Sequence, residues 1–283
     1  MTKPTLLVLR RLRRAAAAIA FFFAVLLLPA AASAQTAQDH GGNRIEPFRQ
    51  FGIVVDGSPQ RTRACSEARE WCAEIIRTPP DGILTLVISP GEGIFDQAPT
   101  LTYLLAPDLD GAQGVTIWDR IVIQADGAVL VGLVFSSEVL RPGFRSYQRR
   151  LLLLRAGPGI TDVATPVLEA PLSGLIQQDV CAPADQQANP DGACENRFSM
   201  STLVTLTPIL SPGRPGLILM VRSHTTPGRR LRWEGLREPV ERSGHDEVVD
   251  PTCTYSRSYQ FDDAAGRYVP DAPTPDCRDF LEP

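Results

Sequence analysis

Three histidines, His40, His224 and His245, are the side chains of this sequence best suited to proton transfer near neutral pH. A serine hydrolase brings a histidine together with a serine and a carboxylate, and the composition allows that combination. The nucleophile motif G-x-S-x-G does not occur, however. We interpret His224, after a predicted strand, and His245, in a polar stretch, as strand-end and surface residues. The sequence therefore nominates no catalytic residue.

Six cysteines offer redox chemistry instead. In an oxidising compartment an even number of cysteines predicts disulfides, although the count leaves their connectivity open. Spacing favours three local pairs: Cys65–Cys72, Cys181–Cys194 and Cys253–Cys277. Cysteines that bind structural zinc are usually about two to four residues apart. The gaps here are six, twelve and twenty-three residues, which favours disulfides over a metal site.

The first cysteine pair also predicts local structure. Residues seven apart on a continuous helix are separated by about 10 Å along its axis. A disulfide allows at most about 7 Å between the two α-carbons. A bond between Cys65 and Cys72 therefore predicts a stapled hairpin or tight turn.

An acidic stretch in the middle of the chain resembles a calcium-binding loop only at its start. Asp108-Leu109-Asp110-Gly111 has suitable carboxylates, and Asp119 falls at the twelfth position. Ala112 and Gln113 occupy positions where an EF-hand needs an oxygen ligand and a glycine. We predict an acidic turn there and no metal site.

A run of arginines around one tryptophan could bind an anionic ligand or a glycan. Its members are Arg229, Arg230, Arg232, Trp233 and Arg237. Glutamates alternate with these arginines, and mixed charges are typical of a solvated loop. The polar stretch is nevertheless long for a loop of a compact domain, and such loops often carry function. We predict that residues 229–247 form the contact surface for a partner.

Lysine occurs only once, at Lys3. A phosphate-binding P-loop, a pyridoxal phosphate site and an S-x-x-K acyl-transfer site each depend on a lysine. The rest of the chain excludes all three classes, and we expect no cofactor.

The first 34 residues are typical of a cleaved export signal. Lys3 and four arginines form a positive head, an uncharged stretch covers 15–28, and Ala32-Ser33-Ala34 suits a signal peptidase. The alternative is an uncleaved anchor, which Pro29 and the small residues disfavour. Removal of this segment would change the formal net charge from −4 to about −9, which disfavours binding of nucleic acid.

After a loose segment over 35–47, short apolar or β-branched runs separated by turn residues dominate the chain. They cover 51–55, 83–89, 101–105, 115–124, 129–135, 147–154, 203–210, 217–221 and 255–261. Asp126-Gly127 predicts a tight hairpin turn, and the apolar run 129–135 predicts a strand covered on both faces. A second hairpin is expected within 256–269. No long helical period occurs, so residues 48–283 predict one antiparallel all-β domain, either a sandwich or an incomplete propeller-like array.

Together these features favour an exported, soluble, β-rich protein of the periplasm or cell exterior. We expect a non-enzymatic binding or structural module of the bacterial cell envelope, with an envelope protein or glycan as partner. After removal of the signal we expect no transmembrane segment. The alternative is a secreted hydrolase that acts on an envelope polymer through carboxylates or a Ser/His/carboxylate site.

Overall fold

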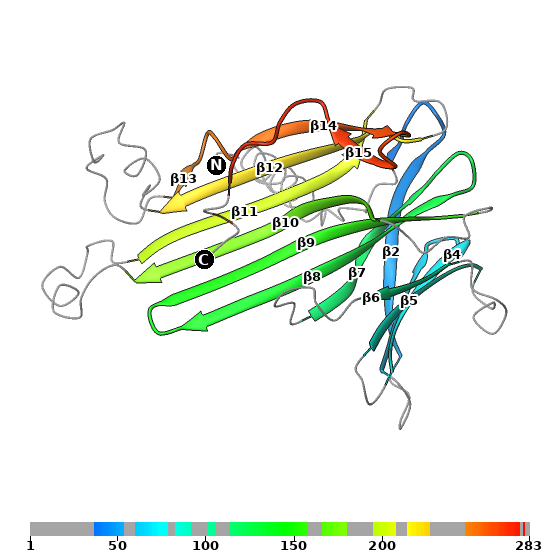
Figure 1. Ribbon diagram of the computed structural model, residues 1–283, viewed down its shortest axis with the longest axis horizontal. Coiled ribbons are helices and arrows are strands. Elements are labelled where there is room, and N and C mark those ends of the chain that lie inside the picture. Colours follow the sequence, from blue (N-terminus) through cyan, green and yellow to red (C-terminus); the bar gives the residue numbers. More distant parts are fainter. Residues whose placement is uncertain are drawn as a thin grey trace, which may run out of the picture. The chain divides into compact units, whose positions relative to one another are not determined.

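A computed structural model describes residues 37–53, 60–78, 83–91, 101–105, 114–157, 166–179, 195–207, 214–226, 247–277 and 280. All of them belong to one compact unit, Thr36–Pro283. Fifteen β-strands account for most of these residues (Figure 1). Their bounds are β1 (Ala37–Gln38), β2 (Arg44–Ile53), β3 (Gln60–Ser66), β4 (Trp71–Thr78), β5 (Ile83–Pro90), β6 (Leu101–Leu105), β7 (Gly114–Ile123), β8 (Val129–Arg141), β9 (Phe144–Ala156), β10 (Pro166–Asp179), β11 (Glu195–Leu206), β12 (Leu217–Thr226), β13 (Val248–Val249), β14 (Tyr255–Asp262) and β15 (Arg267–Pro270).

The described strands form one hydrogen-bonded sheet, in the order β15-β14-β12-β11-β10-β9-β8-β7-β2-β3-β4-β5-β6. Strand β1 pairs with β2, and β13 pairs with β12. Every pairing between these strands is antiparallel. The predicted antiparallel all-β class is therefore confirmed. The finer prediction of a sandwich or an incomplete propeller-like array is not confirmed.

Strand β2 belongs to two parts of the sheet. Its first four residues, 44–47, pair with β7, and residues 48–53 pair with β3. In Figure 1, β2 runs across the direction of β9 to β12. Strands β3, β4 and β5 follow β2 in the sheet order. The apolar side chains on one of their faces pack against β7, β8 and β9.

The hairpin of β7 and β8 is built as the sequence predicts. Ile123 pairs with Val129, and the amide of Gln124 donates to the carbonyl oxygen of Ala128 at 2.8 Å. Gly127 has a φ of 82°, a conformation that glycine adopts without steric cost. Residues 129–135 are all buried, so the predicted strand covered on both faces is confirmed.

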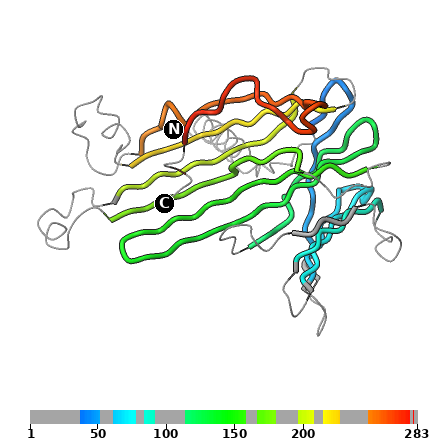
Figure 2. Tube along the Cα trace, viewed as in Figure 1, coloured from blue at the N-terminus to red at the C-terminus, as the bar shows by residue number. Residues whose placement is uncertain are grey.

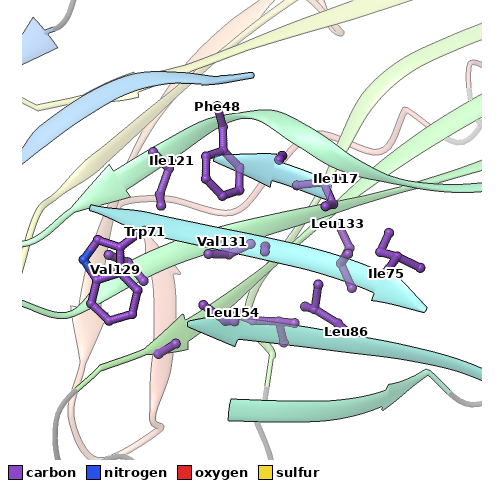
Figure 3. Close-up of a cluster of buried hydrophobic side chains, with 14 of the residues drawn as sticks. Phe48, Trp71, Ile75, Leu86, Ile117, Ile121, Val129, Val131, Leu133 and Leu154 are labelled. Carbon is purple, nitrogen blue, oxygen red and sulfur yellow. The ribbon is translucent and has the colours of Figure 1, made fainter. Parts of the chain in front are cut away.

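Alternate residues of β8 enter two separate cores. Val131 and Leu133 lie in a first core with Trp71 and Leu86 (Figure 3), whereas Leu130 and Val134 lie in a second. The second core also holds side chains from β2, β11, β12, β14 and β15. Strands from distant places in the sheet order share it, so the sheet must curve strongly.

The first disulfide closes a hairpin, as predicted. Cys65 of β3 and Cys72 of β4 are bonded, with their α-carbons 4.1 Å apart, and they are direct partners in the strand register. Strands β3, β4 and β10 were nonetheless not predicted from the sequence. Polar residues interrupt the apolar pattern of β3 and β4, and β10 contains prolines and a glycine, which usually weaken a strand.

The chain after β12 forms the second predicted hairpin, in which Asp262 of β14 pairs with Arg267 of β15. Figure 2 shows this C-terminal segment, in orange to red, beside β12. The Cys253–Cys277 disulfide is formed, with α-carbons 5.8 Å apart. Cys181 and Cys194 lie outside the described residues, so the third pair stays a prediction.

Candidate functional site

Most residues of the predicted contact surface lie outside the described parts of the chain. These residues are Arg229, Arg230, Arg232, Trp233, Arg237 and His245. His40 is exposed in a turn over 39–42, and His224 lies half-buried on β12. The structure nevertheless defines where the predicted surface attaches.

The two ends of the predicted contact surface are held side by side. Strand β12 ends at Thr226, and the described chain resumes at Glu247. Thr225 pairs with Val248, and His224 pairs with Val249, so β13 returns along β12. Segment 180–194 also begins and ends at this end of the sheet, because Asp179 pairs with Glu195. Two long segments therefore leave the sheet at the same end.

Next to these attachment points, strands β9 to β12 present a polar face, which we call the open face. It is defined by residues that are exposed or half-buried: Arg145, Tyr147, Arg149, Ser173, Leu175, Gln177, Arg197, Ser199, Ser201, Arg222 and His224. Direct cross-strand partners lie on the same face of a sheet. One such row runs Arg149, Ser173, Ser201, Arg222, and its neighbour runs Tyr147, Leu175, Ser199, His224.

The opposite side of these strands is closed by a third core. Ile176, Phe198 and Val221 are buried there together with the Cys253–Cys277 disulfide. Phe280, which is fully buried, meets Phe198 edge to face with ring centroids 5.6 Å apart. The C-terminal segment thus covers one side of the strands and leaves the open face as the other.

An irregularity in β10 separates the open face from the second core. Before it, Ala170 pairs with Leu151, and both are buried in that core. After it, Leu175 pairs with Tyr147 on the open face. The register shifts by one residue between Pro171 and Ser173, as expected for a β-bulge. Beyond the bulge, odd-numbered β10 residues share the face of odd-numbered β9 residues.

The open face combines arginines with the carboxylates of Glu138 and Asp179. Arg145 is paired with Glu138 through Nη2 and Oε1 at 3.0 Å. Within the described part of the chain, Arg149, Arg197 and Arg222 have no ion-pair partner. Other unpaired arginines exist, but Arg77, Arg120 and Arg267 are scattered over β4, β7 and β15. The three on the open face are concentrated on one surface.

A serine, a histidine and a carboxylate lie close together on the open face. Ser199 and His224 are direct cross-strand partners, and Ser199 Oγ donates to Glu247 Oε1 at 3.4 Å. A serine hydrolase needs the serine hydroxyl to donate to the imidazole, and the imidazole to donate to the carboxylate. Here the serine donates to the carboxylate directly, so this group is not arranged for acyl transfer.

Carboxylates also gather around Arg44, far from the open face in the strand order. Arg44 pairs with Glu46, with Nε and Oε2 3.5 Å apart, and with Glu70. Burial raises the pKa of Glu46, and the positive charge of Arg44 opposes that shift. Glu46 is nearly buried, and its Oε1 has no hydrogen-bond partner. Glu46 and Glu70 thus contact the same guanidinium group.

The described residues contain no group of three or more His, Cys, Asp or Glu side chains that could hold a metal ion. The predicted acidic turn over 108–111 lies outside them, while Asp119 is exposed on β7. No helix in the described chain has the length and apolar character needed to span a bilayer.

Comparison of the chain with protein-family models, curated proteins and solved structures finds no match. The function must therefore be argued from the site itself. Sequence reasoning missed the open face because its arginines are spread over three strands that are distant in the chain. Polar and apolar residues alternate along β11, which could have identified Arg197 as outward-facing, but they do not alternate around Arg149 or Arg222.

Proposed function

We propose that this protein is an exported, non-enzymatic binding module of the bacterial cell envelope. Its binding site comprises the open face and the adjoining segment 227–246, which contains the predicted arginine-rich contact surface. The observation that carries this proposal is the pairing of β12 with β13, which attaches that segment directly beside His224 and Arg197. A rigid sheet that presents a polar face and long segments at one end is a common arrangement for binding proteins.

Export is part of the proposal. Two disulfides among the described residues support an oxidising compartment, where such bonds form and persist. We propose that Cys181 and Cys194 form the third bond and that the strands around the second core pack as two layers. Exported protein should begin at Gln35 and contain no free thiol, which intact-mass spectrometry with and without alkylation would measure.

Binding is tested by cosedimentation of the oxidised protein with isolated bacterial envelopes. Reversal of three charges in R229E/R230E/R232E should abolish cosedimentation. The matched variant R77E/R120E/R267E changes the net charge equally on scattered strands and should cosediment as the wild type does. Equal cosedimentation of the two variants would eliminate the 227–246 segment as the contact surface.

The second candidate function is a hydrolase acting on an envelope polymer. The grouping of Ser199, His224 and Glu247 favours it in composition, and the raised pKa of Glu46 favours it for a carboxylate mechanism. Release of soluble fragments from envelopes by the wild type, and its loss in H224A or E46Q, would replace the binding module with this enzyme.

A further inference from the structure

We propose that the open face binds an extended acidic polysaccharide, whose carboxylate or phosphate groups are received by Arg149, Arg197 and Arg222. This inference rests on the proposed function, because it names the ligand of that same site. It concerns arginines different from those of segment 227–246, so the two proposals can fail separately.

The spacing of the arginines requires a ligand with several separated charges. Arg149 and Arg222 lie in one row, three strands apart, so their backbones are about 14 Å apart. Arg197 lies four residues from Ser201 along β11, which is also about 14 Å. Side chains stand roughly perpendicular to a sheet, so these guanidinium groups do not converge on one small anion. A polymer with repeated charges fits this spacing.

The residues between the arginines favour a sugar polymer over a protein. Ser173 and Ser201 separate Arg149 from Arg222, and Gln177 lies between Arg145 and Arg197. Hydroxyl and amide groups can donate to and accept from sugar hydroxyls. Protein interfaces are depleted in serine and contain a buried apolar and aromatic centre. On the open face, serines occupy the positions between Arg149 and Arg222.

An exposed apolar pair continues the face beyond Ser201 and Arg222. Leu203 and Met220 are direct cross-strand partners with 51% and 41% of their surfaces exposed. Such a pair suits the apolar side of a sugar ring. One pair of exposed apolar side chains is not the large apolar surface that inserts into a membrane interface.

Carboxylates lie on the open face as well: Asp179, which is exposed, follows Gln177 on the same face of β10. Glu138 is occupied by Arg145, and Glu247 accepts the hydrogen bond of Ser199 beside His224. Glu138 lies opposite Tyr147, so both contacts belong to the row of Tyr147 and Ser199 and not to the row of Arg149 and Arg222. The row of Arg149, Ser173, Ser201 and Arg222 itself contains no carboxylate, so an acidic chain can lie along that row.

The test is affinity electrophoresis of the full oxidised protein in gels containing polygalacturonate, with neutral dextran as the comparison polymer. We expect wild-type protein to be retarded by polygalacturonate and not by dextran. The variant R149Q/R197Q/R222Q should bind at least about tenfold more weakly, because several charge contacts are lost together. The control R77Q/R120Q/R267Q carries the same net charge and should bind as the wild type does. Binding by the wild type should weaken as salt is raised.

Several outcomes would overturn this inference. One is equal weakening in the two triple variants; another is stronger binding to phosphatidylglycerol vesicles or to duplex DNA than to polygalacturonate. If the wild type ignores polygalacturonate but still cosediments with envelopes through 229–232, the polysaccharide is wrong and the binding module stands. If the triple variant fails to fold, the double variant R197Q/R222Q replaces it in the same gels, because both side chains are exposed and contribute to no core. Binding of this double variant equal to that of the wild type would then overturn the inference.

Discussion

Pro47 and Phe48 are consecutive residues of β2, yet they pair with different strands. Pro47 lies opposite Arg120 of β7, and Phe48 lies opposite Ser66 of β3. Proline has no amide hydrogen to donate, so it suits the residue at which one ladder ends. Phe48 is 1% exposed and packs in the first core between the two groups of strands. The change of partner and the anchoring of the core therefore occur at neighbouring residues.

Removal of the Phe48 ring should destabilise the protein strongly. The variant F48A leaves a cavity in the first core and should cost about 3–5 kcal/mol of unfolding free energy. Phe51, on the same strand, is 42% exposed, so F51A is a matched control that should change stability much less. Urea unfolding monitored by fluorescence measures both. Similar losses in the two variants would show that β2 does not anchor this core.

The two disulfides should contribute unequally. In the chain-entropy model, the Cys65–Cys72 bond contributes about 2.5 kcal/mol and the Cys253–Cys277 bond about 3.5 kcal/mol, because the second closes a longer loop. The second bond also holds Phe280 against Phe198. The double variant C253A/C277A should therefore unfold at lower urea concentration than C65A/C72A. The reverse order would mean that the β3–β4 hairpin depends on its bond more than the C-terminal segment does.

Local features of this fold could be predicted because local chemistry decides them. Asp126-Gly127 supplies the turn geometry, and seven consecutive buried residues follow it in β8. The Cys65–Cys72 hairpin followed from the reach of a disulfide alone. Each of these predictions depends on residues close together in the chain.

Features that depend on distant pairing could not be predicted. Strand β10 has the composition of a loop, and β9 and β11 stabilise it from both sides. Its register shift beside Leu172 decides which residues of β9 and β10 lie on the open face. The cluster of Arg149, Arg197 and Arg222 appears only once three strands are placed in register. A single sequence contains no local signal for that register.

Tyr268 should stabilise the second core through its hydroxyl. Its Oη donates to the carbonyl oxygen of Pro215 at 2.9 Å, and both groups are buried. The variant Y268F leaves that carbonyl without its partner, which should cost about 1–3 kcal/mol near neutral pH. Y255F is the matched control, since Tyr255 is only half-buried, and it should change stability less.

The same hydroxyl should make the protein sensitive to alkali. Burial raises the pKa of Tyr268, with Arg214 opposing the shift. The folded state therefore keeps this proton at pH values where the unfolded chain loses it, and stability falls as the pH rises above the ordinary tyrosine pKa of about 10. Thermal melts from pH 8 to 11 should show a smaller decline for Y268F. A parallel decline in both proteins would place the alkaline sensitivity elsewhere.

Glu46 should lower stability at neutral pH and not at acidic pH. Burial raises its pKa in the folded state, so folding favours the protonated form. The protonated carboxyl therefore favours the folded state, and this stabilisation is fully present below the carboxyl pKa of the unfolded chain. It is lost as the pH rises through the pKa of Glu46 in the folded state. The variant E46Q keeps a neutral side chain, and Arg44 retains Glu70 as its partner. We expect E46Q and the wild type to melt together near pH 4 and E46Q to melt higher at pH 7.

The exposed carboxylate Glu70 provides the control, because E70Q should show no such pH-dependent gain. A lower melting temperature for E46Q at pH 7 would mean that its attraction to Arg44 outweighs the cost of burying its charge.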